Sequence, residues 1–318
     1  MAFQFIQPIS RVKTVKKSEK SQRALEELRN YLDCEIDEPI RFLGRFFEEQ
    51  RDAISYSDLR TIIENEEIPK EVMKKWFENY AALVAEKITP LWKITMVAGY
   101  QSNPVFKDLP NFKFDTSEKL VREWLTERSA YLVTNCTENQ REAIRYVISE
   151  AKYYQMSPAE TAKYLRPVIG LTKPQEAANL RLYHSVKAQL REEHPRMRAD
   201  TIERKARHAA ARYAEKQHRY RAEMIARTEM ATAYHQGNDA AVRQGIAQGL
   251  LPKMKKVWST ARDGKVCSMC LALEGMEVDL DSRFKGEQGR RIVQILLPPA
   301  HPHCACAVIY EEVKNEKV

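Results

Sequence analysis

Two short runs near the end of the chain concentrate the side chains that could bind a metal ion. The first is Cys267-Ser-Met-Cys270, and the second runs from Pro298 to Cys306. Four of the six cysteines and two of the seven histidines of the chain lie in these runs. A Cys-x-x-Cys on a tight turn presents two thiolates at a separation that one tetrahedral metal ion can bridge. The second run supplies the remaining donors, so the pair of runs predicts a metal site.

Soft thiolates combined with imidazole favour zinc over magnesium or calcium. Four protein ligands with no open position are typical of a structural zinc site, not a catalytic one. The expected ligands are Cys267, Cys270, His301 and Cys304. Cys306 is the main alternative, because on a strand it would point to the same side as Cys304. His303 is a further alternative ligand. The competing interpretation is that no metal binds and the cysteines are ordinary buried thiols.

An enzymatic role for the same cysteines needs residues that the sequence lacks. The run Arg262-Asp-Gly-x-x-Cys-x-x-Cys resembles the opening of treble-clef nucleases of the His-Asn-His type, in which a His and an Asn hold a hydrolytic metal. Between Cys270 and His301 there is neither His nor Asn. A redox role would call for a thioredoxin-like βαβ context, which is also missing. We therefore expect no catalytic residues, with a metal-dependent nuclease as the alternative function.

The cysteines belong to a short β-containing module at the end of the chain, residues 251–318. Four candidate strands are expected there, at 255–261, 277–280, 292–297 and 306–311, with a turn at Asp263-Gly264. A module of this size has little core of its own. A bound zinc would supply the missing folding free energy.

A long basic helix, expected from about Arg198 to Gln248, leads into this module. It is rich in Ala, Arg, Glu and Met, which are strong helix formers. Between Arg181 and Arg227 there are thirteen Lys or Arg and six Asp or Glu. This surplus predicts an electrostatic surface for nucleic acid that neutralises phosphates without reading sequence. A solvated helix face with i,i+4 ion pairs, such as Glu203–Arg207, is the competing interpretation. The candidate nucleic-acid-binding residues are Arg204, Lys205, Arg207, Arg212, Lys216 and Arg219.

Capping signals predict further helices upstream of the basic one. Capping boxes at Thr137, Ser157 and Thr172 predict helices over 138–154, 158–168 and 173–191. The preceding residues show helical periodicity from Ser21, with a linker expected near 101–116. The predicted regions are a basic flexible arm (1–20), an N-terminal helical unit (21–115), a central helical region (116–250) and a Cys/His-rich α+β module (251–318).

The predicted fold class is therefore mainly α, with an N-terminal helical unit, a central helical bundle with a long basic helix, and a small zinc-stapled, β-containing C-terminal module. The net charge of +8 favours a polyanionic partner. No secretory signal and no run of about 20 apolar residues is visible, so we expect no membrane association. The clustered cysteines suit a reducing compartment better than a disulfide framework.

An ordered series of motifs in the second half of the chain resembles the phage Mu F-like minor head protein family. The series comprises Ile225-Ala-Arg-Thr-Glu229, Gly237, Lys256-Val-Trp258, the Arg262 to Cys270 run and the Pro298 to Cys306 run. The resemblance covers roughly residues 155–310, and Gly170-Leu-Thr172 fits the family's upstream helices. Ala305 departs from the family, which usually has Arg between the two cysteines.

The resemblance implies a minor capsid protein of a tailed phage, acting in head morphogenesis. Such a protein is made in the host cytoplasm and enters the virion, in the head interior. Its implied partners are the portal protein, around which it would form an oligomer, other head proteins, and double-stranded DNA bound non-specifically during packaging or delivery. No enzymatic activity is implied. Within this series, Arg227, Thr228 and Glu229 are expected to have a structural role, in pairing with neighbouring charges and docking the long helix on the β module, with contact to a partner as the alternative. Gly237 is expected to be a structural residue of the same motif.

Overall fold

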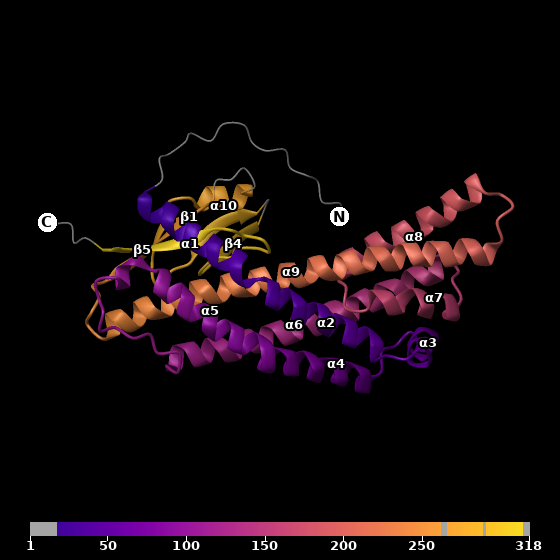
Figure 1. The fold of residues 1–318 in the computed structure, drawn as a ribbon, viewed down its shortest axis with the longest axis horizontal. Coiled ribbons are helices and arrows are strands. Elements are labelled where there is room, and N and C mark those ends of the chain that lie inside the picture. The colour runs from indigo at the N-terminus through magenta and orange to yellow at the C-terminus, as the bar shows by residue number, and fades with distance from the viewer. Residues whose placement is uncertain (1–17, 262–265, 289–290, 314–318) are drawn as a thin grey trace. The chain divides into compact units, whose positions relative to one another are not determined.

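The computed structural model of the protein describes residues 18–261, 266–288 and 291–313. The described part is mainly helical, with two small antiparallel sheets near its C-terminal end (Figure 1), so the predicted fold class is confirmed. Most of the basic arm predicted for residues 1–20 lies outside the described residues, and so does the turn predicted at Asp263-Gly264.

The chain forms two compact units, each built from segments that are not consecutive in sequence. The first unit contains Met1–Glu35, Leu91–Val121 and Arg227–Val318, and the second contains Ile36–Pro90 and Arg122–Ala226. Each unit combines segments from more than one of the regions predicted above. Two long helices, α6 (Lys119–Tyr153) and α9 (Ala199–Ala247), contribute residues to both units.

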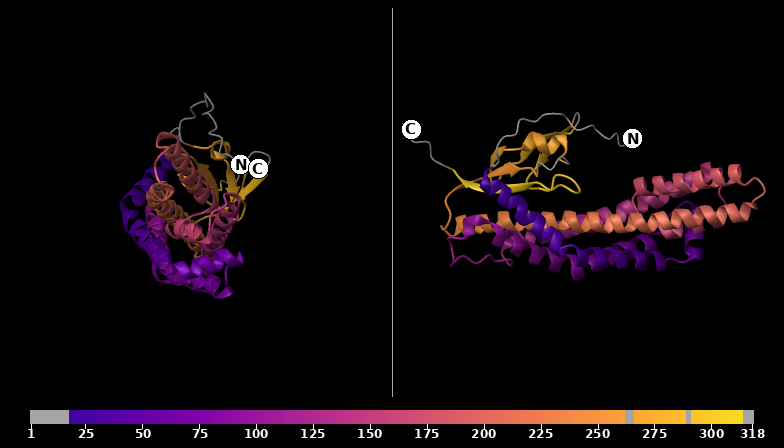
Figure 2. Two further views of the ribbon diagram at one scale, coloured as in Figure 1. Left: turned by 90° about the vertical axis from the view of Figure 1, so that its right-hand side faces the viewer. Right: turned by 45° about the horizontal axis from the view of Figure 1, so that its top comes forward.

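The second unit is entirely helical in its described residues. Besides parts of α6 and α9, its elements are α2 (Asp37–Asp52), α3 (Tyr56–Asn65), α4 (Lys70–Leu83) with a π-helical turn (Val84–Ile88), α7 (Pro158–Leu165) with a 3-10 turn (Arg166–Val168), and α8 (Lys173–Glu193). Figure 2 shows α8 and the start of α9 as an antiparallel hairpin. The hairpin buries a stripe of small residues, Ala206, Ala210 and Ala214, whose i, i+4 spacing places them on one helix face.

The first unit places a small sheet against helices. Its elements are α1 (Glu19–Glu35), α5 (Thr89–Ser102), a 3-10 turn (Pro104–Phe106), the end of α9, α10 (Ser268–Leu273), and the strands β1 (Met254–Ser259), β2 (Glu277–Asp279), β3 (Phe284–Gln288), β4 (Arg291–Ile295) and β5 (Ala307–Glu312). The order in the three-stranded antiparallel sheet is β2-β1-β5, and β3 pairs with β4 as a separate hairpin. Trp258 of β1 and Phe284 of β3 pack edge to face at the centre of the core.

Two glycines allow α5 and α9 to approach each other closely within the first unit. A Cβ atom added to Gly237 would lie 2.2 Å from the backbone oxygen of Met96. A Cβ atom added to Gly99 would lie 2.0 Å from the backbone oxygen of Tyr234. Each helix therefore presents a glycine to the backbone of the other, and the close contact of Gly237 is with α5.

Most predicted element starts agree with the structure, with one clear exception. The capping boxes at Ser157 and Thr172 are formed, and the carboxylate of Glu160 accepts the Ser157 backbone N–H at 2.9 Å. The capping box predicted at Thr137 is wrong, because Thr137 lies inside α6. Its hydroxyl instead donates to the backbone oxygen of Val133, one helical turn earlier, at 2.9 Å.

The C-terminal module contains one strand more than the sequence predicted. The strands β1, β2, β4 and β5 fall on the predicted segments, within one or two residues at their ends. The strand β3 was not predicted, and it pairs with β4 from Phe284 opposite Ile295 to Gln288 opposite Arg291.

Candidate metal centre

The helix α10 begins at the first cysteine pair. Cys267 is the N-cap residue, with an extended backbone, and its Sγ accepts a hydrogen bond from the backbone N–H of Cys270 at 3.4 Å. This bond takes the place of the hydroxyl cap that Ser or Thr would provide.

The imidazole of His301 faces this pair through one ring nitrogen. Its Nδ1 lies 2.8 Å from the carbonyl oxygen of Pro302, so Nδ1 carries the proton and donates it. The lone pair of Nε2 is then free to act as a ligand. Nε2 lies 3.3 Å from Sγ of Cys267 and 3.4 Å from Sγ of Cys270. A backbone carbonyl that orients the second ring nitrogen is a regular feature of metal-bound histidines.

The remaining two cysteines approach from the residues that precede β5. Sγ of Cys304 lies 3.9 Å from Sγ of Cys270. The five donors thus fall into two groups that share Cys270. One contains Cys267 and His301, the other Cys304 and Cys306, and the ligand atoms within each group lie within 4.8 Å of one another. Cys270, Cys304 and Cys306 are all buried, within the apolar core of the first unit.

Each group of three donors is close enough for one metal ion, but Cys304 and Cys306 do not group with Cys267 and His301. With Zn–S near 2.3 Å and Zn–N near 2.0 Å, the edges of a tetrahedral site are roughly 3.5 to 3.8 Å long. The observed separations are close to these values for three pairs only: 3.3 Å for Cys267–His301, 3.4 Å for Cys270–His301 and 3.9 Å for Cys270–Cys304. The four donors expected from the sequence therefore meet at Cys270, and Cys304 lies outside the group that Cys267 and His301 form with it. The Sγ atom of Cys306 lies within 4.8 Å of those of Cys270 and Cys304, so Cys306 is still the alternative ligand to Cys304. The cluster could hold zinc on its donor chemistry and spacing.

The thiols perturb one another strongly. The pKa of Cys304 is lowered because the thiols of Cys270 and Cys306 donate hydrogen bonds to it. The pKa of Cys270 is raised, first by its hydrogen bonds to Cys304 and Cys306 and then by burial. Without a cation, crowded thiols cannot all ionise, and a bound divalent metal removes this conflict.

His303 lies apart from both donor groups. Its backbone adopts a left-handed conformation with φ of 59°, and its side chain lines a cavity beside α1 with Leu28 and Arg227. Neither of the metal-binding groups found among the described residues includes it.

A buried polar cluster, which was not predicted from the sequence, joins the β module to α9. Asp239 of α9 is 2% exposed, and its carboxylate accepts bonds from Arg243 Nε at 2.7 Å and from the Tyr310 hydroxyl of β5 at 3.1 Å. Arg243 also donates to Asp281 at 2.5 Å and to the carbonyl oxygen of Leu280 at 2.6 Å. The i,i+4 spacing of Asp239 and Arg243 was the only signal in the sequence.

Lys256, part of the motif series in β1, is completely buried. Its ammonium group donates to the carbonyl oxygens of Ser282 and Leu296, both at 3.0 Å, and lies 5.5 Å from the ring centroid of Phe284. Burial lowers its pKa. This lysine ties β1 to the segments on either side of the β3–β4 hairpin.

The other motif residues lie on α9 within the first unit. Arg227 donates to Asp33 of α1 at 2.9 Å. Glu229 is buried, at 4% exposure. The close contact of Arg227 thus joins α9 to α1, while the contacts that join α9 to the β module are made further along, by His235, Asp239 and Arg243.

Four of the six candidate nucleic-acid-binding residues share one exposed face of α9. Lys205, Arg212, Lys216 and Arg219 follow at steps of seven, four and three residues, which align on an α-helix, and all four are exposed. Arg204 is exposed but points about a quarter turn away. Arg207 is half-buried and contacts Glu203 at 3.5 Å.

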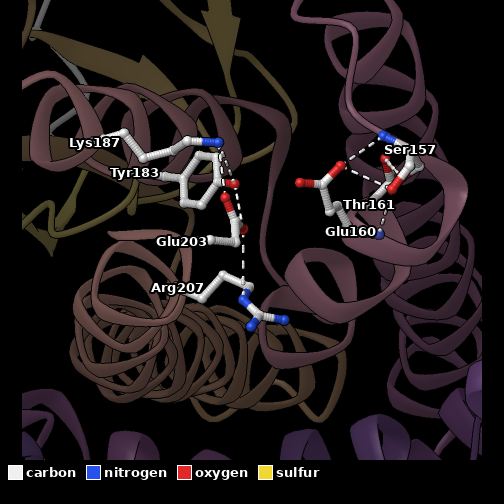
Figure 3. A network of polar contacts seen from close by, with 7 residues as sticks. All are labelled: Ser157, Glu160, Thr161, Tyr183, Lys187, Glu203 and Arg207. Carbon is white, nitrogen blue, oxygen red and sulfur yellow. Dashed lines mark hydrogen bonds and ion pairs between the residues drawn. The ribbon is translucent and has the colours of Figure 1, made fainter. Parts of the chain in front are cut away.

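Arg207 belongs to a network that joins the two helices of the hairpin (Figure 3). Glu203 lies at its centre and accepts hydrogen bonds from the hydroxyl of Tyr183 at 2.5 Å and from Lys187 at 2.7 Å. Burial, followed by the carboxylate of Glu203, raises the pKa of Tyr183. Figure 3 also shows the capping box of α7, formed by Ser157 and Glu160. The network fixes the hairpin and gives Arg207 a structural contact.

The protein is mainly helical and carries near its C-terminal end a small β module whose Cys/His cluster could hold a metal ion. Residues 181–309 match the family described as Phage Mu protein F like protein. Over these residues the chain is therefore similar to that family, and the match supports a phage head morphogenesis protein. No curated protein and no solved structure matches the chain significantly. Among the described residues, no helix is long and apolar enough to span a membrane.

Proposed function

We propose that the protein is a minor head protein of a tailed phage, which binds the portal and other head proteins and contacts double-stranded DNA non-specifically during packaging or delivery. The family match over residues 181–309 is the observation that carries this proposal. The match includes α8 from Arg181 onwards, all of α9 and the cysteine cluster. In the proposal, the zinc is structural and the protein acts in the head interior without a catalytic step.

The exposed basic face of α9 supports the DNA part of the proposal. Its four cations lie within fifteen residues, and the first and last are about 21 Å apart along the helix axis. Such a row can follow the phosphates of a duplex, which carries one charge per roughly 1.7 Å. No ion pair of Lys205, Arg212, Lys216 or Arg219 is found among the described residues, so their charges are available to an anionic partner.

Salt dependence tests the DNA contact. Four neutralised phosphates predict a slope of about −3.6 in log K against log salt, which weakens binding about 150-fold between 50 and 200 mM salt. Changing Lys205, Arg212, Lys216 and Arg219 to Gln should abolish most of this slope. The matched control changes four exposed cations of the same unit to Gln, namely Arg41, Arg45, Lys70 and Lys75. An equal decrease of the slope in both variants would show that DNA binding depends only on net charge. An unchanged slope in the first variant would show that this face of α9 does not bind DNA.

Association with head proteins is tested separately. The purified protein should co-sediment with portal oligomers, and it should be present in purified particles. Particles that assemble with no trace of the protein would refute the proposed role.

The nuclease alternative makes a different prediction. A metal-dependent nuclease would nick plasmid DNA in the presence of magnesium, and Cys267→Ser would abolish the activity. The present proposal predicts no nicking above a buffer control.

A further inference from the structure

Two exposed tyrosines stand at the end of α6, in the second unit. Tyr153 is the last residue of the helix and is 79% exposed, and Tyr154 follows it at 42%. Gln155 then takes a left-handed conformation, with φ of 52°, and the N–H of Met156 donates to the carbonyl oxygen of Ala151 at 2.8 Å. This is the hydrogen bond of a Schellman cap, which satisfies the last turn of a helix. The cap thus fixes the backbone that carries the two exposed rings.

The two rings continue into α8 as a row. Tyr153 lies edge to face against Tyr154, with 5.0 Å between the ring centroids. Tyr154 stacks on the imidazole of His184 at 3.6 Å, with an angle of 26° between the ring planes. Burial, followed by the charge of Lys187, lowers the pKa of His184, so its ring is neutral at pH 7. The row therefore consists of three uncharged flat rings, and its outermost ring lies mostly in water.

Exposed cations on α8 flank this row. Lys173, Arg181 and Arg191 lie within about a quarter turn of one another around the helix, over about 27 Å along its axis. The ammonium group of Lys173 lies 5.7 Å from the ring centroid of Tyr146 on α6, so α6 and α8 lie side by side here. No ion pair of these three cations is found in the part of the chain that the structure describes.

The surface around the rings keeps a positive charge. Glu150 lies one helical turn from both Tyr146 and Tyr154 on α6, so its carboxylate offsets one of the three cations. Exposed aromatic rings beside uncompensated cations are typical of surfaces that bind single-stranded nucleic acid, since the rings stack on bases and the cations follow the phosphates. In a duplex the faces of the bases are covered by their neighbours, so only unpaired bases can use such rings.

We propose that this aromatic strip binds single-stranded nucleic acid, with unpaired bases stacked on its rings and phosphates held by its cations. The strip is made of Tyr153, Tyr154, His184, Lys173, Arg181 and Arg191. The choice of nucleic acid as the partner rests on the proposed function. The residues differ from those of the basic face of α9, and the ligand is a single strand where that face takes a duplex, so the two contacts can be tested apart.

Fluorescence anisotropy with a labelled oligothymidylate measures the binding to the full chain. Tyr153→Leu removes the most exposed ring and leaves the contact of Tyr154 with His184 in place, so it should weaken binding about fivefold without affecting the fold. The double variant Tyr153→Leu/Tyr154→Leu should weaken binding about 25-fold, at about fivefold for each ring. The matched control, Tyr56→Leu/Tyr131→Leu, removes two exposed tyrosines elsewhere in the same unit and should leave the affinity unchanged.

Further measurements separate the strip from the basic face of α9. Neither variant at Tyr153 should change the affinity for duplex DNA. Changing Lys173, Arg181 and Arg191 to Gln should flatten the salt slope for oligothymidylate by about 2, because each neutralised phosphate of a single strand contributes about 0.7. An oligothymidylate that carries 5-iodouracil should crosslink on irradiation to the tryptic peptide 153–163, which begins with the two tyrosines.

Four results would overturn the inference. They are no binding of oligothymidylate at low salt, equal affinity of the unchanged chain and the double variant, an equal loss of affinity in the control at Tyr56 and Tyr131, and crosslinks that all lie outside the peptide 153–163. Loss of duplex binding in the α9 variant, with oligothymidylate binding retained, would support two separate sites. Absence of duplex binding in the unchanged chain, with the strip behaving as expected, would count against the α9 surface alone.

Discussion

Replacing Gly237 with alanine tests the close contact of α5 and α9. The added Cβ would lie 2.2 Å from the backbone oxygen and 2.3 Å from the Cα of Met96. Real Cβ atoms essentially never approach a neighbour closer than 3.0 Å, so the two helices must separate by at least about 0.8 Å. The obstacle is backbone, and no side-chain rotation can relieve it.

The expected cost follows from two opposing effects. Overpacking of this kind destabilises a protein by about 3 kcal/mol when the neighbours cannot turn aside. Replacing glycine by alanine in a helix returns about 1 kcal/mol through backbone entropy. The net loss for Gly237→Ala is therefore about 2 kcal/mol, which corresponds to a fall in Tm of about 4–8 °C for a unit of this size.

Gly44 provides the control. It lies in α2, and a Cβ added there meets nothing within 4 Å. Gly44→Ala should raise stability by about 0.5–1 kcal/mol, since only the helix-propensity effect remains. Thermal unfolding of both variants, followed by circular dichroism or calorimetry, measures the difference. If the Gly237→Ala protein were as stable as the unchanged chain, the steric conflict between α5 and α9 inferred here would be refuted.

Three further predictions concern the buried polar groups. Elemental analysis should find about one zinc per chain. The zinc should be retained in Cys306→Ser and lost in Cys304→Ser. Zinc retained in Cys304→Ser and lost in Cys306→Ser would show that Cys306, not Cys304, is the fourth ligand. Burial lowers the pKa of His218 to about 4, below its unfolded value near 6.5, so its neutral form stabilises the fold above pH 6.5. As pH falls from 6.5 to 4, this stability is lost, and the free energy of unfolding of the unchanged chain, measured in urea, should fall by about 3 kcal/mol more than that of His218→Gln. An equal fall in both proteins would contradict the assignment. Arg243→Met should cost about 3 kcal/mol, because it leaves the carboxylate of Asp239 buried without its cation; a loss below 0.5 kcal/mol would show that the pair is dispensable.

Local signals in the sequence predicted the elements whose ends depend on local chemistry. The starts of α7 and α8 were predicted because Ser157 and Thr172 satisfy backbone groups only a few residues away. The same pattern at Thr137 failed, since the helical periodicity of α6 continues through it and the threonine hydroxyl can bond to the preceding turn. A capping motif therefore does not mark a helix start when the residues before it are also helical.

Features that depend on contacts between residues far apart in the sequence could not be predicted from it. The strand β3 carries a polar sequence, Phe-Lys-Gly-Glu-Gln, and becomes a strand through its pairing with β4. Asp239 and Lys256 look like ordinary surface charges in the sequence, but tertiary contacts bury them at 2% and 0% exposure. The cysteine donors were predictable because metal ligands must combine particular side-chain types at short spacings, which a sequence displays directly.

The continuity of α9 limits what a fragment of this protein can do. The helix runs without a break through 49 residues, and the boundary between the units at Ala226 and Arg227 falls inside it. A piece limited to the family match, residues 181–309, would lack α5, and with it the backbone that Gly237 packs against. It would also expose the apolar stripe that α9 buries in the second unit. Expressed alone, the part that carries the family relationship should therefore aggregate, and the zinc site should be studied in the whole chain.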